Sequence, residues 1–210
     1  MTERYDLVVI GSGPAGHHAA IQAAELGRRV AIVERRYVAG GECVNTGTIP
    51  SKAMREAVLH LSGYRQRLFY GPQYVVKKNI TAQDLRQRAF QVVDLETSVF
   101  YNQLRRSGID VIKGRASFLG AHRIAVDHCD EACEIEADFF VLATGSMPAR
   151  PESIPFDDTS IFDSETFLQI PALPRSLLII GAGVVGVEYA CMTAALGIPT
   201  VLVDKRASML

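Results

Sequence analysis

Apolar residues gather in short runs near the start and near the end of the chain, and a glycine turn and an Ala-rich segment follow each run. The first stretch, residues 7–36, predicts a strand, a helix that ends at Leu26-Gly27, and a second strand. Shifted by 170 residues, the stretch 177–206 repeats this order without a gap, with eleven of thirty positions identical. The chain therefore contains an internal repeat of a strand–helix–strand unit.

The pattern between the two copies predicts two more helices. One is expected from Pro50, which suits a first helical turn, to about Phe69. A longer one is expected from Thr81 to Arg106, with Thr81 and Asp84 resembling a capping box and Gly108 as the stop. The apolar stripe of the longer helix predicts core packing and consists of Leu85, Ala89, Val92, Val93, Val99, Phe100 and Leu104.

After residue 108 the sequence pattern predicts short strands instead of helices. Residues 109–138 predict a β-meander, and residues 139–145 predict a buried strand that ends in a small-residue turn. Five prolines between residues 148 and 174 predict a crossover between domains. The predicted class is α/β: a Rossmann-like doubly wound sheet with a β-meander over 1–150, a linker over 151–174, and the start of a second Rossmann-like domain over 175–210.

Composition and charge narrow the class of protein. Lysine and arginine number 22 against 23 aspartates and glutamates, which argues against a nucleic-acid or membrane-surface partner. Four cysteines are too few for a disulfide scaffold and suit a reducing cytoplasm, and the N-terminus lacks a signal-peptide pattern. Residues 177–203 have one charge, Glu188, but four glycines and Pro199 interrupt them, so no membrane helix is predicted.

Each copy of the repeat has the spacing of a dinucleotide-binding fingerprint. Glycines permit a tight turn, a close approach of backbone to pyrophosphate and close helix–strand packing, and an acid 18 residues beyond the third glycine can bind a ribose. A mononucleotide unit, a nucleotide-sugar unit or a glycine turn without a ligand is the alternative for a single copy. Two matched copies favour two dinucleotides, held by Gly11, Gly13, Gly16 and Glu34, and by Gly181, Gly183, Gly186 and Asp204.

The order of motifs resembles the pyridine nucleotide–disulfide oxidoreductases over the whole chain. The motifs are GSGPAG at 11–16, GGEC at 40–43, IPSK at 49–52, ATG at 143–145 and GAGVVG at 181–186 with Glu188. The resemblance implies FAD at the first fingerprint and NAD(P)H or NAD(P)+ as substrates at the second. It also implies that the chain is the N-terminal portion of a longer architecture, with a truncated NAD(P)-binding domain and a homo-oligomer only in the full-length protein.

The resemblance assigns cofactor contacts to matching positions. For FAD they are Gly11, Gly13, Pro14, Ala15, Gly16, Glu34, Arg35, Gly40, Gly41, Cys43, Thr48, Lys52, Ala116, Thr144 and Gly145. For NAD(P) they are Gly181, Gly183, Val184, Val185, Gly186, Glu188 and Asp204. Arg206 could meet a 2′-phosphate, whereas Asp204 favours NAD, so the pair is compatible with use of both nucleotides.

The position of Thr48 distinguishes this chain within the family. The family motif has two cysteines that form a redox-active disulfide, at positions matching 43 and 48, and here only Cys43 is a cysteine. A dithiol relay needs two sulfurs, so electrons that enter the flavin are expected to leave as hydride to a nicotinamide. This pattern resembles the soluble, Si-specific transhydrogenase branch of the family. Cys43 is then expected to be a packed small residue rather than a nucleophile.

Lys52 is the second catalytic candidate, together with Glu188. The resemblance places Lys52 beside the flavin N5 and pairs it with Glu188; a surface lysine in a first helical turn is the alternative. A disulfide reductase that uses Cys43 and a non-catalytic nucleotide-binding module are the rival functions.

The remaining histidines and cysteines predict no further site. His17 and His18 are expected to be exposed polar positions, although either could lie near a ligand. His128, Cys129 and Cys133 lack a fourth ligand with suitable spacing, so no metal site is predicted.

Overall fold

The chain is divided by its contacts into two compact units, each made of two separate stretches. The computed structural model defines residues 3–128 and 131–207. The first unit comprises residues 1–49 and 93–147, and the second comprises 50–92 and 148–210. Of the three boundaries between the units, those at 49/50 and 92/93 fall within helices, and the one at 147/148 falls in a loop. The functional division predicted at residues 150 and 174 stays a prediction.

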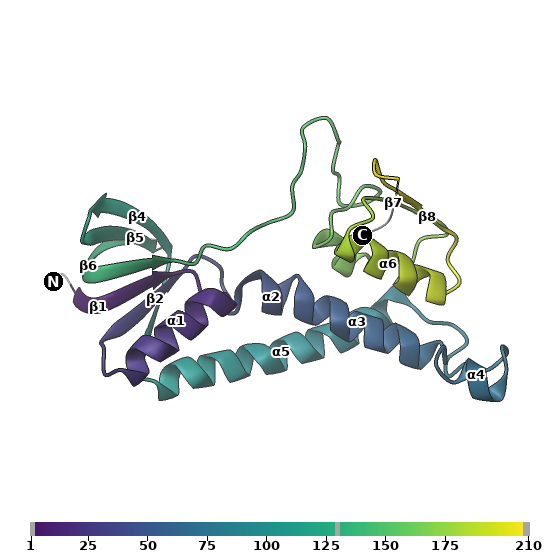
Figure 1. Cartoon of the computed structure of the whole chain (residues 1–210), viewed down its shortest axis with the longest axis horizontal. Helices are drawn as coiled ribbons and strands as arrows, with labels where there is room; N and C mark the ends of the chain where they lie inside the picture. Colours follow the sequence, from purple (N-terminus) through teal and green to yellow (C-terminus); the bar gives the residue numbers. More distant parts are fainter. Residues whose placement is uncertain (1–2, 129–130, 208–210) are drawn as a thin grey trace. The chain divides into compact units, whose positions relative to one another are not determined.

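The first unit contains a six-stranded sheet in the order β3–β2–β1–β6–β5–β4 (Figure 1). Four of these strands are parallel, because β1 pairs with both β2 and β6 and β2 pairs with β3. Parallel neighbours need a crossover, and α1 supplies it between β1 and β2. The strands are β1 (Glu3–Ile10), β2 (Val30–Glu34), β3 (Asp110–Lys113), β4 (Arg115–Gly120), β5 (Arg123–His128) and β6 (Glu131–Leu142), and α1 is Pro14–Glu25.

Both faces of the parallel strands are covered. Val9 of β1 belongs to a buried cluster with Ala20 of α1 and Leu104 of the long helix α5 (Ala82–Arg106). Its neighbour Val8 belongs to a second cluster with Ile124 of β5. Because successive strand residues point to opposite faces, helices cover one face and the meander covers the other. The predicted Rossmann-like doubly wound sheet with a β-meander is confirmed.

Two details of the strand prediction were wrong. The stretch 109–138 does not form only a meander, because β3 joins the parallel sheet beside β2 and the antiparallel meander consists of β4, β5 and β6. The run 139–145 is not a separate strand but the end of β6, since no glycine or proline interrupts Glu131–Leu142. Nor is this end uniformly buried, because Phe139 is 72% exposed and Leu142 is 66% exposed.

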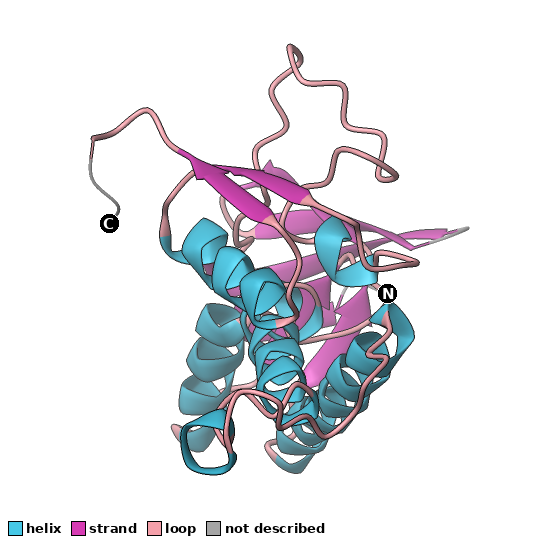
Figure 2. Cartoon of the chain, turned by 90° about the vertical axis from the view of Figure 1, so that its right-hand side faces the viewer, coloured by secondary structure: helices cyan, strands magenta, loops and turns pink. Residues whose placement is uncertain are grey.

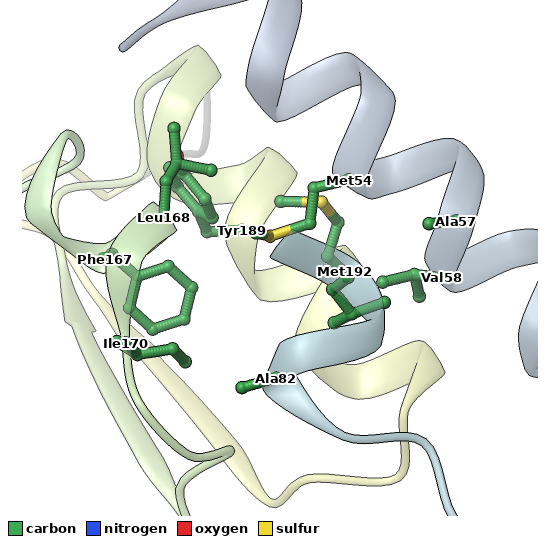
Figure 3. Packing of buried hydrophobic residues seen from close by; sticks show 10 residues of the cluster. Met54, Ala57, Val58, Ala82, Phe167, Leu168, Ile170, Tyr189 and Met192 are labelled. Atoms are coloured by element: carbon green, nitrogen blue, oxygen red, sulfur yellow. The ribbon is translucent and has the colours of Figure 1, made fainter. Parts of the chain in front are cut away.

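The second unit is built around helices. Its elements are α3 (Thr48–Leu61) from Pro50 onward, α4 (Arg67–Tyr70), the first turns of α5, the 3₁₀ turn η1 (Thr166–Gln169), β7 (Leu177–Ile180), α6 (Val184–Ala195) and β8 (Thr200–Val203). Their apolar side chains form one core in which Met54 of α3, Phe167 of η1 and Met192 of α6 meet (Figure 3). Tyr189 and Met192 of α6 belong to this core, whereas the first turn of α6, at the second fingerprint, is exposed.

The helix predicted from Pro50 to about Phe69 is interrupted. Helix α3 ends at Leu61, and α4 begins at Arg67. Gly63 has a φ of +66°, and a Cβ there would lie 2.7 Å from the ring of Tyr74. The chain therefore turns at a position that favours glycine, and the helical pattern on either side did not reveal it.

The internal repeat is confirmed as a structural repeat. In the second unit, β7 and β8 are parallel and α6 connects them (Figure 2). Leu177 is paired with Thr200, as Leu7 is paired with Val30 in the first copy. The apolar run 177–203 is thus two strands and a twelve-residue helix. Within residues 3–128 and 131–207, the helices are too short or too polar to cross a membrane.

Helix α5 begins with the predicted capping box. The Asp84 backbone N–H donates to Thr81 Oγ1 at 3.2 Å, and the Thr81 N–H donates to the Asp84 carboxylate at 2.8 Å. Bonds from Lys77 and then from Thr81 hold the pKa of Asp84 at about 2, so the carboxylate persists down to strongly acidic pH. In the predicted stripe, Leu85, Ala89, Val93 and Leu104 are buried, whereas Val99 is 40% exposed and was wrongly assigned to the core.

We expect Thr81→Ala to lower the free energy of unfolding by about 1 kcal/mol, because the first turn of α5 loses its side-chain acceptor. Urea denaturation followed by circular dichroism measures this. Gln83→Ala, at an exposed position of the same turn, is the control and should change stability by less than about 0.5 kcal/mol. Equal effects of the two substitutions would contradict the capping role.

Candidate functional site

The first fingerprint folds into a tight turn between β1 and α1. Gly11 has a φ of +106°, and a Cβ at Gly16 would lie 2.0 Å from the Gly11 carbonyl oxygen. Helix α1 begins after Gly13 without a side-chain cap, and Pro14 stands in its first turn. The N–H groups at the start of α1 are therefore available to an anion, as a pyrophosphate site requires.

The Glu34 side chain holds the glycine turn of the first fingerprint through hydrogen bonds. Its carboxylate is buried and accepts hydrogen bonds from Ser12 N at 2.9 Å, Ser12 Oγ at 2.6 Å and Arg36 N at 2.8 Å. Ser12 Oγ in turn accepts from the Gly40 N–H at 3.1 Å. A carboxylate has about four acceptor positions, so one position remains for a ribose hydroxyl.

A cavity of about 640 Å³ lies within the first unit, at the carboxyl ends of the parallel strands. Its volume is in the range of small-molecule sites, and its place is where open α/β sheets bind ligands. Eleven of the predicted FAD contacts line it: Gly11, Gly13, Pro14, Glu34, Arg35, Gly41, Cys43, Thr48, Ala116, Thr144 and Gly145. Ala15 is exposed, and Gly16 and Gly40 are buried beside the turn without lining the cavity.

Several lining residues were missed by the sequence analysis. Ser12, Arg36, Glu42, Arg115 and Met147 line the cavity as well. Ser12 lies inside the fingerprint itself, so its small polar side chain was a usable signal. Arg115 follows Gly114, whose N–H donates to the Glu34 carbonyl at 2.9 Å, and this pairing between β2 and the end of β3 is not visible in the sequence.

The segment with Cys43 and Thr48 closes the cavity. Cys43 lies in the short helix α2 (Gly41–Asn45) as a half-buried free thiol, and Thr48 is the first residue of α3. The Asn45 amide donates to the carbonyls of Ala39 at 3.0 Å and Gly41 at 2.8 Å, which braces the loop. Cys43 and Thr48 therefore line one cavity, and a disulfide between positions 43 and 48 is chemically excluded.

The second fingerprint reproduces the geometry of the first. Gly181 has a φ of +111°, and a Cβ at Gly186 would lie 1.9 Å from the Gly181 carbonyl oxygen. Helix α6 begins after Gly183 without a side-chain cap, and Val184 and Val185 in its first turn are exposed. Asp204 accepts from the Ala182 N–H at 2.7 Å. This turn also suits the pyrophosphate of a dinucleotide.

The second unit contains the ion pair that the family resemblance implies. Lys52 Nζ lies 2.7 Å from Glu188 Oε2, and the side chains are 54% and 15% exposed. A pair with one exposed partner contributes at most about 1 kcal/mol to stability. Beside it, burial and then the Glu188 charge raise the pKa of Tyr189, whose hydroxyl donates to the Ser164 carbonyl at 2.9 Å. Tyr189 therefore stays neutral and structural.

His17 is not exposed, contrary to the sequence prediction, whereas His18 is. The ring of His17 is 3% exposed and lies 4.1 Å from that of Phe100, because this face of α1 meets α5. Neither ring nitrogen has a hydrogen-bond partner of normal geometry within the described residues. Burial, followed by the charge of His18, lowers the pKa of His17, while the nearby Phe100 backbone acts weakly in the opposite direction.

The sequence predicted no metal site at the turn with His128, Cys129 and Cys133. The structure describes this turn only in part. Cys129 lies outside the described residues, and Cys133 is an exposed free thiol. Among the residues that the structure describes, histidine, cysteine and carboxylate side chains do not form a group of three or more that could hold a metal ion.

Comparison with known proteins identifies relatives along the whole chain. The family model described as Pyridine nucleotide-disulphide oxidoreductase matches residues 5–210. The soluble pyridine nucleotide transhydrogenase of Mycobacterium tuberculosis is 49% identical over 208 residues, and that of Colwellia psychrerythraea is 39% identical over 210 residues. Each alignment covers 98% of this chain, and the chain spans 44% of the length of these curated relatives.

Solved structures of two proteins are also similar to this chain. The Cu(II) complex of the HOCl-induced flavoprotein disulfide reductase RclA from Escherichia coli matches with a TM-score of 0.82 and 29% identity, over 100% of this chain and 44% of that one. LpdA from Mycobacterium tuberculosis matches with a TM-score of 0.88 and 26% identity, over 100% of this chain and 46% of that one. The family and the RclA structure, whose title names a flavoprotein, imply the use of FAD and NAD(P).

We expect Glu34→Ala to lower the free energy of unfolding by about 1.5–3 kcal/mol even without a ligand, because buried donors of Ser12 lose a charged acceptor. Urea denaturation measures this. Glu42→Ala is the control, since the Glu42 carboxylate lines the same cavity and accepts a long contact of 3.5 Å from the exposed Ser146 Oγ. Equal destabilisation by both substitutions would show that Glu34 does not organise the turn.

Proposed function

The chain belongs to the pyridine nucleotide-disulphide oxidoreductase family, and on this basis we propose that it is the nucleotide-binding part of an enzyme that transfers hydride from NADPH to NAD+. In the balanced reaction, NADPH loses a hydride and becomes NADP+, while NAD+ gains it and becomes NADH. The observation that carries the proposal is Thr48 in the cavity that Cys43 also lines.

The residues present in the first unit fit FAD. The uncapped start of α1 would hold the pyrophosphate, and the remaining acceptor position of Glu34 would hold a ribose hydroxyl. The walls of the cavity from Cys43 to Thr48 would face the rest of the cofactor. When bound, FAD supplies the two-electron chemistry, and the protein contributes binding and orientation.

Thr48 determines which electron acceptors remain. A disulfide relay forms a mixed disulfide at one sulfur and needs a second sulfur to resolve it. The Thr48 hydroxyl can donate or accept a hydrogen bond, but it forms neither a thiolate nor a disulfide. With one thiol among the described residues that line the cavity, the acceptor that the fold still offers is a second nicotinamide nucleotide. The relatives at 49% and 39% identity are named transhydrogenases, which supports a nicotinamide nucleotide as the electron acceptor.

The second fingerprint fits the nicotinamide substrates, because its glycine turn and its strand-end acid repeat the geometry of the first. The role predicted for Lys52 beside the flavin stays a prediction, supported by its ion pair with Glu188. A cation of this kind would favour negative charge that develops on the cofactor. We also propose the cytoplasm as the location and a homo-oligomer for the full-length protein.

A disulfide reductase is the second candidate function. Cys43 is a free, half-buried thiol that lines the cavity, and one structural neighbour is named a flavoprotein disulfide reductase. Such a function would need a resolving thiol from outside this segment, because position 48 is not a cysteine. A reactive, low-pKa Cys43 and turnover of a disulfide substrate would favour it.

We expect Cys43→Ser to keep transhydrogenation within about tenfold of the parent rate, a change of about 1.4 kcal/mol in the barrier, because no sulfur relays electrons. The measurement is hydride transfer from NADPH to thio-NAD+ by the FAD-loaded full-length protein that contains this segment. If the rate is lost while FAD stays bound, the direct route is wrong, and the disulfide reductase function gains support. If the protein does not bind FAD at all, the function that remains of those considered is a non-catalytic nucleotide-binding module.

We expect Thr48→Cys to restore the Cys-x4-Cys spacing of the disulfide reductases. Reductive titration of this variant should consume about two more electrons per FAD, because a disulfide is a two-electron couple, and should give a long-wavelength thiolate-to-flavin absorption band. Thr48→Ser, which keeps the hydroxyl, is the control and should show neither change. A variant that titrates like this control would contradict the assignment of position 48.

A further inference from the structure

The Ser12 hydroxyl connects two parts of the first unit that are far apart along the chain. Its Oγ donates to Glu34 Oε2 at 2.6 Å and accepts from the Gly40 N–H at 3.1 Å. The same N–H also lies 3.2 Å from the Ser12 carbonyl oxygen. Ser12 is fully buried, which strengthens hydrogen bonds relative to those exposed to water. The hydroxyl therefore links the acid at the end of β2 to the residue that precedes α2.

The second copy of the repeat shows that the glycine turn forms without this hydroxyl. Ala182 stands at the position of Ser12 in the repeat. Its N–H donates to Asp204 at 2.7 Å, as the Ser12 N–H donates to Glu34 at 2.9 Å. The first glycine has a φ of +106° in one copy and +111° in the other, so the two turns share one backbone conformation. The contact that the hydroxyl adds lies outside the turn, at Gly40.

The loop that receives this bond is continuous with the helix that contains Cys43. Gly40 is the residue directly before α2. The Asn45 side chain donates to backbone carbonyls on both sides of Gly40, so the loop and the short helix are braced together. A Cβ at Gly41 would lie 2.8 Å from the Gly13 Cα, so the loop also packs closely on the fingerprint turn. A displacement of Gly40 is therefore transmitted to the helix of Cys43.

We propose that Ser12 is a positioning residue that couples nucleotide binding at Glu34 to the order of α2 and to the accessibility of the Cys43 thiol. A ribose that binds Glu34 favours the ordered network, because that network holds the carboxylate in place. Through the Ser12 hydroxyl, the same network holds Gly40 at the start of α2. This inference deepens the proposed function and rests on dinucleotide binding at the first fingerprint.

Removal of the hydroxyl breaks the link and leaves its two ends supported. In Ser12→Ala, Glu34 keeps the backbone donors of residue 12 and Arg36, and the Gly40 N–H keeps the carbonyl of residue 12 as an acceptor. Ala182 shows that alanine fits this turn. The variant is therefore expected to fold and to bind a nucleotide. Loss of one neutral hydrogen bond changes a local opening equilibrium by about fivefold.

The test is the rate at which iodoacetamide alkylates Cys43, resolved by peptide mass spectrometry in the full-length protein that contains this segment, after removal of FAD. Without ligand, Ser12→Ala should raise this rate about fivefold. Saturating ADP, which lacks a flavin, should slow it about fivefold in the parent and less than about twofold in the variant. Cys191, an exposed thiol, is the internal reference. Ser98→Ala, which removes a hydroxyl bonded within α5 at 2.8 Å, is the control and should behave like the parent.

The outcomes separate this inference from the proposed function. If calorimetry shows that the parent does not bind ADP, the dinucleotide assignment of the first fingerprint and the coupling fall together. If ADP binds but protects Cys43 equally in the parent and in Ser12→Ala, or if the variant alkylates at the parent rate, the coupling alone is wrong. Amide hydrogen exchange gives a second readout. Faster exchange confined to residues 40–45 supports the positioning role, and faster exchange throughout the first unit would show a general structural role instead.

Discussion

A carboxylate at the end of the second strand fixes the glycine turn in each copy of the repeat. In the first copy Glu34 accepts from the backbone and the hydroxyl of Ser12, and that hydroxyl accepts from Gly40, so three separate segments are joined by one buried network. The turn also requires glycine, since a Cβ at Gly16 would lie 2.0 Å from the Gly11 carbonyl oxygen. The turn, the start of α1 and the loop with Cys43 together line the cavity.

In both copies a carboxylate at the end of a strand accepts from the glycine turn, but the neighbouring side chains differ. The first copy completes its acid with a serine hydroxyl, and its cavity is bordered by α2 and by the ends of β3 and β6. The second completes its acid with an arginine that is half exposed. The two copies therefore hold the same backbone turn with different side chains.

Local spacing made much of the fold predictable from the sequence. The two glycine turns and the capping box at Thr81 and Asp84 depend on residues close in sequence, and they form as predicted. Glu34 and Asp204 lie at the predicted strand ends, where they accept hydrogen bonds from the turns themselves. Non-local packing determined what was missed. The joining of β3 to β2 and the burial of His17 against Phe100 depend on segments far apart along the chain. The bond between Ser12 and Gly40 is of the same kind, and only the folded chain shows it.

The buried histidine on α1 has a consequence for acid conditions. Because its pKa is lowered from 6.5 in the folded chain, His17 binds a proton more readily when the chain is unfolded. Below about pH 6.5 the unfolded state therefore gains protons first, and the free energy that holds α1 against α5 declines as the pH falls towards the lowered pKa. The first residues of the same helix line the cavity. Acid therefore destabilises the folded chain through a histidine on the helix whose start borders that cavity.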